Sequence, residues 1–399
     1  MNRHLTHQQP RRFVLLTGAT GLVGSYLLRD LFLQGCQIAV VVRPSKRMTG
    51  AQRIESIMQR WEQELGQTLP RPVVLEGDVC QSNLGLSDAE IEWIGSHCRQ
   101  ILHSAAVLQF SGSTEAEEPW RTNLGGTRNV LELAEQAGIK DFHYVSTAYV
   151  CGKRTERILE TDLDCDQQFR NDYEKSKFAA EQLVRAATHL TSTTIYRPAV
   201  IVGDSQTGYT LTFHGLFLYL RLIATLVPQQ RKNSQGIINT PIRLPLDGDE
   251  PRNLVTVDWV SQVISHLFCT PGAHGRTYHL SPDHFVTARD VIEYCYEYFN
   301  STGVEFCGRN AQRNGDNDFA ARLFENISVY AAYETSDPNF DKTNVNKFAG
   351  HIPCPIIDKA MILRFLEFGK SIRWGKQRES WPPVDCLSTS QLASVDAEN

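Results

Sequence analysis

Residues 15–28 read LLTGATGLVGSYLL, a stretch in which three glycines lie between an apolar run and a helical pattern. Gly18, Gly21 and Gly24 are spaced three apart. Glycine permits a tight turn and close approach of the backbone, and the free N–H groups at a helix start bind phosphate oxygens. The stretch therefore predicts a dinucleotide-binding turn, although a glycine-rich turn without a ligand has the same pattern. The turn residues expected at the cofactor are Gly18, Thr20, Gly21, Leu22, Val23 and Gly24.

Short apolar runs alternate with amphipathic segments along the first half of the chain. This alternation is typical of an α/β fold, in which helices cover both faces of a parallel sheet. We therefore expect a Rossmann-type, doubly wound parallel sheet with a smaller C-terminal substrate lobe. The expected strands are 13–17, 38–43, 73–77, 101–104, 142–147 and 193–197, and the expected helices are 24–34, 52–65, 119–137 and 172–189.

Composition excludes several classes of protein. Of 399 residues, 41% are hydrophobic and 21% are charged, and the net charge of −5 argues against a nucleic-acid surface. Ten cysteines without any C-x-x-C pair indicate reduced thiols, with neither a metal site nor a disulfide framework. The most apolar run, 216–227, contains Arg221 and is too short to span a bilayer. We expect a soluble, cytoplasmic protein with no transmembrane segment.

Three further motifs accompany the glycine turn, in a fixed order. They are EGDVC (76–80), HSAA (103–106) and TNLGGTRNVLELA (122–134). Together with Thr17 and the G-x-x-G-x-x-G spacing, they resemble the extended short-chain dehydrogenase/reductase superfamily over residues 12–300. The resemblance implies a nicotinamide cofactor with contacts at Asp78, Val79, Ala105 and Ala106.

The end of the second expected strand, AVVVRPSKR (39–47), bears on the choice of cofactor. An acidic residue there would bind the ribose 2′-hydroxyl of NAD, but this strand ends in Arg43. A guanidinium suits a 2′-phosphate, which it binds through two parallel hydrogen bonds. We therefore expect NADPH rather than NADH, with Lys46 and Arg47 as solvated loop residues.

The sequence YEKSK (173–177) supplies a candidate catalytic pair. Tyr173 and Lys177 are four apart and would share one helix face, where the ammonium would stabilise the phenolate of the tyrosine. In YVSTAYVCG (144–152), the resemblance assigns the hydroxyl that orients the substrate to Thr147, with Ser146 in a supporting role. The expected catalytic residues are Thr147, Tyr173 and Lys177, and the last two and Pro198 are also expected at the cofactor.

The stretch YRPAVIVGDSQTG (196–208) distinguishes branches of the superfamily. With VTVDWV (255–260) and TYHLS (277–281), it resembles the thioester reductase and fatty acyl reductase branch. The resemblance implies reduction of an acyl thioester, on coenzyme A or on a separate acyl-carrier protein, to an aldehyde; further reduction to the alcohol is left open. The glycines of this stretch are expected to bend a loop over the nicotinamide pocket.

The chain is expected to divide into four regions. Residues 1–11 and 381–399 are expected to be disordered, 12–205 to form the NADP-binding Rossmann domain with the catalytic residues, and 206–380 to form the substrate lobe, with later strands shared by the sheet. An apolar stripe in the lobe could line an acyl tunnel or could be ordinary core. Its members are Phe213, Leu216, Phe217, Leu220 and Ile223.

Two alternatives to a thioester reductase stay open. One is a hydroxysteroid-like or sugar-nucleotide dehydrogenase or epimerase of the same superfamily. The other is a non-catalytic NADP-binding sensor, which would not need a tuned phenol. The sequence does not predict the oligomeric state, the acyl-chain length or a role for residues 309–378.

Overall fold

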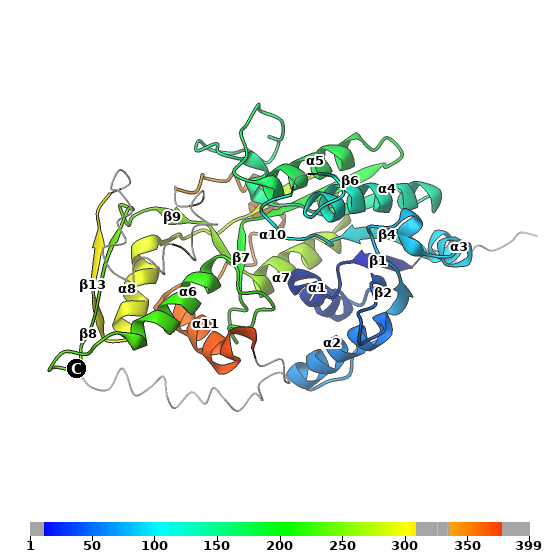
Figure 1. Cartoon of the computed structure of the whole chain (residues 1–399). Helices are drawn as coiled ribbons and strands as arrows, with labels where there is room; N and C mark the ends of the chain where they lie inside the picture. Colours follow the sequence, from blue (N-terminus) through cyan, green and yellow to red (C-terminus); the bar gives the residue numbers. More distant parts are fainter. Residues whose placement is uncertain (1–11, 113, 309–324, 326–332, 334–335, 377–399) are drawn as a thin grey trace, which may run out of the picture.

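The computed structural model describes residues 12–112, 114–308, 325, 333 and 336–376. The ends expected to be disordered, 1–11 and 381–399, lie outside the described residues, as does much of 309–378. Figure 1 shows an elongated molecule, with a large sheet and its helices on one side and a smaller lobe on the other.

Seven parallel strands form the central sheet, in the order β3–β2–β1–β4–β5–β6–β11. The strand order reverses between β1 and β4, and ligands of such sheets bind at the carboxyl ends of the strands beside that point. The predicted Rossmann-type sheet is therefore confirmed. The strands are β1 (Phe13–Thr17), β2 (Gln37–Val42), β3 (Val73–Glu76), β4 (Cys98–His103), β5 (Asp141–Val145), β6 (Ser192–Pro198) and β11 (Thr277–Leu280).

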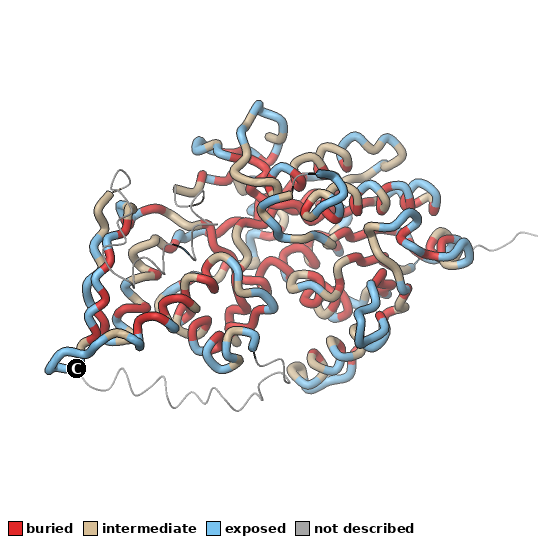
Figure 2. Tube along the Cα trace, viewed as in Figure 1, coloured by how far each residue is buried: buried red, intermediate tan, exposed pale blue. Residues whose placement is uncertain are grey.

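Both faces of the sheet are buried, which explains why its strands read as continuous apolar runs (Figure 2). Alternate residues of a strand point to opposite faces. On β1, Val14 and Leu16 pack into the core that contains α1, α2 and α7, whereas Leu15 packs into the core on the other face. Each of these three side chains is fully buried.

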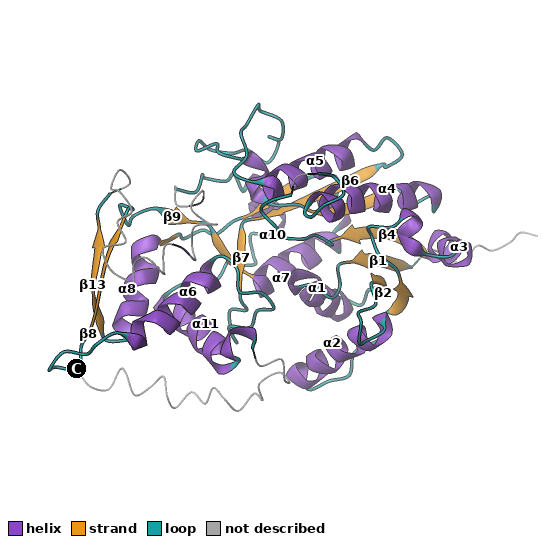
Figure 3. Ribbon diagram, in the orientation of Figure 1, coloured by secondary structure: helices purple, strands orange, loops and turns teal. Residues whose placement is uncertain are grey.

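Helices cover the two faces of the sheet (Figure 3). The first face carries α1 (Leu22–Leu33), α2 (Gly50–Leu65), α7 (Val257–Phe268) and α10 (Thr343–Ala349). The second carries α3 (Asp88–His97), α4 (Thr127–Gln136) and α5 (Asp172–Ala186). Helix α3 is not among the helices named from the sequence, and α4 is preceded by a π-helical turn over Arg121–Gly126 within the segment expected to be one helix.

The lobe has its own apolar core and two short sheets. Its helices are α6 (Leu216–Leu226), α8 (Ala288–Tyr298) and α11 (Lys359–Ser371). Strand β8 (Ile238–Leu244) pairs in parallel with β13 (Ser301–Phe306), and β9 (Pro251–Arg252) pairs antiparallel with β12 (Val286–Thr287). Over the described residues, no helix combines the length and apolarity needed to cross a membrane.

The chain passes between the sheet and the lobe several times. Strand β7 (Val200–Val202) pairs with β10 (Leu254–Thr256) at the junction of the two units. Residues beyond 205 are divided between the units, because α7, β11 and α10 return to the sheet after the first part of the lobe. The lobe is therefore built from separate segments of sequence.

A buried ion pair joins α5 to the strands beside it. Glu181 and Arg197 are both fully buried, and the guanidinium donates to the carboxylate from Nη2 at 2.7 Å and from Nε at 3.1 Å. The Ser146 hydroxyl donates to the same carboxylate at 2.7 Å. Burial alone would raise the pKa of the Glu181 carboxyl, but the Arg197 charge and these hydrogen bonds hold it below its usual value.

We expect Glu181→Ala to lower the free energy of unfolding by about 3–5 kcal/mol, because it leaves the Arg197 charge buried and unpaired. Arg185 is the matched control, since it contacts the same carboxylate at 2.8 Å with a side chain that is 34% exposed. Arg185→Ala should cost less than about 1 kcal/mol. Urea denaturation of both variants checks the difference, and equal losses would contradict it.

Candidate active site

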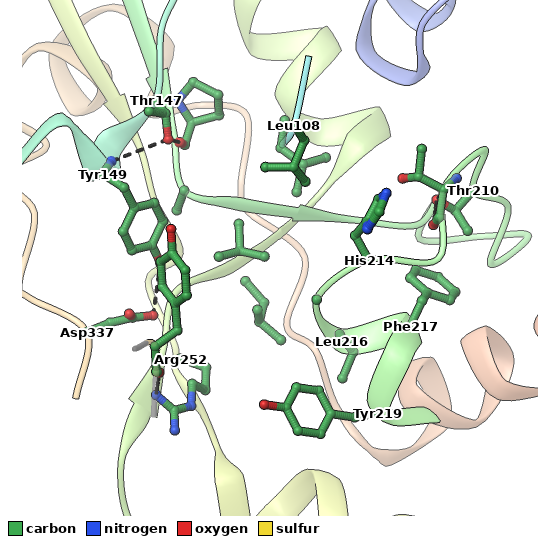
Figure 4. Close-up of a pocket in the computed structure, with 18 of the residues that line it drawn as sticks. Leu108, Thr147, Tyr149, Thr210, His214, Leu216, Phe217, Tyr219, Arg252 and Asp337 are labelled. Atoms are coloured by element: carbon green, nitrogen blue, oxygen red, sulfur yellow. Dashed lines mark hydrogen bonds between the residues drawn. The ribbon is translucent and has the colours of Figure 1, made fainter. Parts of the chain in front are cut away.

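One cavity of about 490 Å³ runs from the glycine turn into the lobe. Its first part is lined by Gly18, Gly21 and Gly24, and its middle part by the three expected catalytic residues. Beyond these it extends between α6, α8 and β8. Figure 4 shows the lobe end, where Leu216, Phe217 and Tyr219 of α6 lie across the cavity from Tyr149 and Asp337. The volume lies within the range of about 300–1,000 Å³ that is usual for small-molecule sites.

The glycine turn leaves a concave backbone surface that a side chain would fill. Gly18 has φ +77°, in the left-handed region, and a Cβ there would lie 2.6 Å from the nitrogen of Ala105. A Cβ on Gly24 would lie 2.0 Å from the carbonyl oxygen of Gly18. Helix α1 begins at Leu22, so its first N–H groups face this turn. The residues present therefore fit the pyrophosphate of a dinucleotide.

The end of β5 and the first two turns of α5 bring the expected catalytic residues to one wall. Thr147 follows β5, and its hydroxyl accepts from the backbone N–H of Tyr149 at 3.3 Å and donates to the carbonyl oxygen of Pro198 at 3.4 Å. Tyr173 and Lys177 lie one turn apart on α5, and all three side chains line the cavity. This wall can offer a phenol, a hydroxyl and an ammonium to a polar group of a bound molecule.

Burial raises the pKa of the Tyr173 phenol to about 12, and the charge of Glu174 adds to this rise. The hydrogen bond from Thr147 acts in the other direction but is smaller. The expectation that Lys177 lowers this pKa is therefore not met in the structure. With its pKa well above neutrality, Tyr173 is protonated and able to donate a proton at pH 7.

The reason lies in the position of the lysine. The Nζ atom of Lys177 donates to the carbonyl oxygen of Val145 at 2.8 Å and lies 4.2 Å from the ring centre of Tyr144. Burial lowers the pKa of Lys177 to about 7, against the attraction of Glu181. An ammonium has three donors, so the bond to Val145 leaves two for a molecule in the cavity.

The structure divides the sequence-predicted cofactor residues into two groups. Those that line the cavity are Gly18, Gly21, Leu22, Val23, Gly24, Ala106, Tyr173, Lys177 and Pro198. Those that do not line it are Thr20, Arg43, Asp78, Val79 and Ala105. Thr20, Arg43 and Asp78 lie nevertheless beside the carboxyl end of β2 and the glycine turn.

A second arginine stands next to Arg43. Arg53 of α2 donates from Nη2 to the hydroxyl of Thr20 at 3.0 Å and from Nη1 to the carbonyl oxygen of Arg43. Burial, together with the nearby positive charge of Arg43, lowers the pKa of Arg53. Arg43 itself is 61% exposed and lies 3.6 Å from a carboxylate oxygen of Asp78. Sequence reasoning missed Arg53, because its place on α2 brings it to the turn only in the folded chain.

Polar side chains behind the cavity hold the ends of the central strands in place. His103 at the end of β4 is within 2.6 Å of the Thr17 hydroxyl and 3.1 Å of the Thr127 hydroxyl. Burial lowers the pKa of His103 to about 3, so this bridge is neutral. Asn123 accepts from the N–H of Val107 at 2.8 Å and donates to Ser176 of α5 at 3.0 Å. Residues of the motifs HSAA and TNLGGT therefore connect β1, β4 and α5 through side-chain hydrogen bonds.

The loop GDSQTG (203–208) joins the two units rather than covering the cavity. None of its residues lines the cavity, contrary to the expected position over the nicotinamide pocket. The Asp204 carboxylate accepts from the N–H of Thr207 at 2.8 Å and from the Tyr26 hydroxyl at 3.0 Å. Ser205 donates to Asp258 of α7 at 2.6 Å. The two motifs 196–208 and 255–260 are therefore in direct contact.

The apolar stripe of α6 only partly lines the cavity. Leu216, Phe217 and Ile223 do so, whereas Leu220 is fully buried in the lobe core and Phe213 packs against Trp374. The larger part of the apolar wall comes from residues not singled out in the sequence, on β8, the loop that follows it, β10 and α8. They include Ile242, Leu244, Leu246, Leu254, Val291 and Ile292.

The sequence analysis also did not identify a polar pair in the cavity wall, Tyr149 and Asp337. The buried hydroxyl of Tyr149 donates to Asp337 at 3.0 Å, and the same carboxylate accepts from the N–H of Asn253 at 2.7 Å (Figure 4). Burial raises the pKa of Asp337 despite these bonds. Asp337 lies in the segment DPNFD, where no spacing indicates that it meets Tyr149 nearly two hundred residues earlier.

Comparison with protein families identifies the family of the chain. The family model NAD_binding_4, described as "Male sterility protein", matches residues 16–264. The chain belongs to this family, within the extended short-chain dehydrogenases/reductases that the sequence resembles. It is therefore an NAD(P)-dependent oxidoreductase.

Individual proteins show the same likeness. The chain is 29% identical over 285 residues to a component of the linear gramicidin synthase of Brevibacillus parabrevis, covering 70% of this chain and 5% of that protein. It is 26% identical over 411 residues to aldehyde reductase lnaA of Aspergillus flavus, covering 92% of this chain and 37% of that protein. The chain thus spans well under half the length of these curated relatives. The crystal structure of the terminal R domain from the myxalamid PKS-NRPS biosynthetic pathway is similar over 92% of both chains, with 27% identity and a TM-score of 0.71.

Proposed function

We propose that this chain uses NADPH to reduce an acyl thioester to an aldehyde. The observation that carries the proposal is the continuous cavity, which joins the glycine turn, the Thr147–Tyr173–Lys177 wall and the apolar space of the lobe. The cavity would place a hydride donor at the turn, a proton donor at the wall and an apolar acyl chain in the lobe. The carbonyl group of the thioester would then lie between the hydride donor and the proton donor, as this reaction needs. The similarity to a terminal R domain and to an aldehyde reductase supports the same chemistry.

Each residue of the wall has a role in the proposed reaction. The nicotinamide, when bound, supplies a hydride to the carbonyl carbon of the thioester. Tyr173 donates its proton to the carbonyl oxygen, and Thr147 orients that oxygen, so that a neutral hemithioacetal forms. Lys177 holds the ribose through its remaining donors. Cleavage of the C–S bond, with transfer of the hydroxyl proton to sulfur, then releases an aldehyde and a free thiol.

The proposed substrate reaches the chain on a carrier. Similarity to a gramicidin synthase and to an R domain of a PKS-NRPS pathway supports this route. We therefore place a carrier-protein-bound thioester first and acyl-coenzyme A second. Because aliphatic and aromatic side chains make up most of the lobe end of the cavity, we expect the acyl group to be largely apolar, with Arg252 and Asp337 as the charged groups that it meets there.

The alternative is a dehydrogenase or epimerase acting on a steroid or a sugar nucleotide. A sugar nucleotide needs polar partners for its hydroxyl groups, and a site built for them leaves polar groups unpaired when they are absent. In the described part of the lobe, the cavity presents mainly aliphatic and aromatic side chains. This lining favours a thioester with an apolar acyl chain.

We expect Tyr173→Phe to lower turnover by about 10²–10⁴-fold while leaving NADPH affinity nearly unchanged, because it removes only the proton donor. Single-turnover oxidation of NADPH and a fluorescence titration measure the two quantities. Tyr219→Phe is the control, since it removes a phenol hydroxyl from the lobe end of the same cavity. Lys177→Met should reduce both rate and affinity. A Tyr173→Phe enzyme with the wild-type rate would remove Tyr173 from the mechanism.

We also expect Arg43→Ala and Arg53→Ala each to weaken NADPH about 10–100-fold and to leave NADH nearly unchanged, because only NADPH carries the 2′-phosphate. Lys46→Ala, an exposed change in the same loop, should have little effect on either cofactor. Titration of each variant with both cofactors checks this. Equal losses for NADH and NADPH would show that the arginines act on the fold of the turn instead.

The reaction itself is tested with wild-type protein, NADPH and one acyl chain presented as coenzyme A ester, carrier-protein thioester or free aldehyde. We expect one free thiol per NADPH oxidised in the first reduction, with aldehyde identified by mass. A second NADPH consumed without further thiol would indicate onward reduction to the alcohol. Oxidation of NADPH by steroid ketones alone, or conversion of a UDP-sugar without net NADPH change, would overturn the proposal.

A further inference from the structure

A cluster of two histidines and an aspartate lies at the edge of the sheet opposite the cavity. Asp141 begins β5, His143 lies two residues further on the same strand, and His274 follows the short 3₁₀ turn Pro271–Ala273 that leads to β11. Because strand residues two apart share a face, Asp141 and His143 point to the same side of the sheet. Thr147 lies six positions after Asp141 along this strand and its end, so the cluster is about 20 Å from the catalytic wall.

The cluster contains two buried polar atoms with no hydrogen-bond partner. They are Oδ1 of Asp141 and Nε2 of His143, which lie 3.4 Å apart. His143 is fully buried, and its other nitrogen, Nδ1, is 2.9 Å from the Tyr196 hydroxyl. Buried polar atoms without partners are uncommon in folded proteins, since each one costs free energy. Nε2 of His143 is therefore buried beside the carboxylate of Asp141 without a well-formed hydrogen bond.

The tautomer of His274 also indicates a cation in this cluster. Its Nε2 lies 2.9 Å from the carbonyl oxygen of Phe268, and a carbonyl only accepts, so Nε2 carries a hydrogen. In neutral His274 the other nitrogen, Nδ1, then presents a lone pair to Oδ2 of Asp141 at 3.2 Å. Two acceptors at this distance repel each other unless a cation lies between them. The cation is either a proton on His274 or a metal ion.

Two nitrogen–oxygen separations in the cluster are close to those between the ligands of a tetrahedral metal ion. Zn–N and Zn–O bonds of about 2.0–2.1 Å place the ligand atoms of a tetrahedron about 3.3–3.4 Å apart. Nε2 of His143 lies 3.4 Å from Oδ1 of Asp141, and Nδ1 of His274 lies 3.2 Å from Oδ2. One ligand atom from each of the three residues can be chosen so that all three lie within 4.8 Å of one another. The Asp141 side chain is 23% exposed and that of His274 12%, so an ion and a fourth ligand from water can reach the cluster.

The groups around the cluster have the form of an outer shell that orients metal ligands. The second nitrogen of a metal-bound histidine usually donates to a carbonyl or another acceptor, which fixes its tautomer and ring orientation. Here the carbonyl oxygen of Phe268 contacts His274, and the hydroxyl of Tyr196 contacts His143. Gln100 donates to Oδ2 of Asp141 at 2.5 Å. The imidazole rings of His143 and His274 meet edge to face, with centres 4.5 Å apart. All three ligands are therefore held before any ion arrives.

We propose that Asp141, His143 and His274 form a binding site for a divalent transition metal ion of the zinc class. Two imidazoles and one carboxylate favour Zn²⁺, Co²⁺ or Ni²⁺ over Mg²⁺ and Ca²⁺, which prefer oxygen ligands. The ion links the start of β5 to the segment between α7 and β11, so it stabilises the edge of the sheet and takes no part in the reduction. The cysteine spacing could not reveal this site, because it uses no cysteine.

The test begins with untagged, chelator-treated wild-type protein. We expect calorimetric titration with ZnCl₂ to show one equivalent bound, the melting temperature to rise with Zn²⁺, and CoCl₂ to give the visible absorption of tetrahedral Co²⁺. MgCl₂ should change none of these. NADPH oxidation rates should be equal with and without Zn²⁺ at a temperature where both forms are folded.

Variants separate the metal site from adventitious binding. His274→Gln should weaken Zn²⁺ at least tenfold and abolish the Co²⁺ absorption. His266→Gln is the matched control, because His266 also contacts a backbone carbonyl, that of Phe348 at 3.0 Å, and lies outside the cluster. Asp141→Asn, judged by NADPH binding to be folded, provides a second variant. If wild type binds no equivalent of Zn²⁺, or if His274→Gln and His266→Gln bind it equally, the cluster is a protonated histidine–aspartate pair and the proposal is wrong.

Discussion

The carboxylate of Glu181 is buried beneath the cavity, where it binds the guanidinium of Arg197 and the hydroxyl of Ser146. Ser146 precedes Thr147, Arg197 precedes Pro198, and Glu181 lies one helical turn after Lys177. One buried charge therefore fixes the three chain segments that present the reactive wall. A pair of this kind contributes little net stability compared with apolar packing, but its geometry permits only one arrangement of the segments. Placement of the hydroxyl, phenol and ammonium depends on this constraint.

Burial also sets the pKa values of the two titratable side chains at the wall, Tyr173 and Lys177. Removal from water raises the pKa of Tyr173 to about 12 and lowers that of Lys177 to about 7, so both environments favour the uncharged side chain. A protonated phenol is the form that donates to a developing oxyanion. Lys177 donates to the carbonyl oxygen of Val145 rather than to the phenol of Tyr173. Any effect of Lys177 on the pKa of Tyr173 therefore depends on the molecule bound in the cavity.

The sheet could be predicted from the sequence because its signals are local. The glycine turn, the apolar run of β1 and the four-residue spacing of Tyr173 and Lys177 each lie within one element, and each has its expected place in the structure. Arg53 and Asp337 were missed because they reach the site only through tertiary packing. The lining of the lobe was missed for the same reason, since β8 and α8 show no more than ordinary amphipathic patterns. Tyr173 was expected to have a lowered pKa because the sequence shows its charged neighbour but not its burial.

The lobe is assembled from three stretches that alternate with returns to the sheet: α6 and β8, then α8 and β13, then α11. Its core closes only when α11 is in place, and the core on one face of the sheet likewise needs α7 and α10. Neither unit therefore completes its core without helices that lie late in the sequence. No single contiguous segment carries the whole lobe. To transfer the lobe of one relative into another, a chimaera would therefore have to replace several separate segments at once.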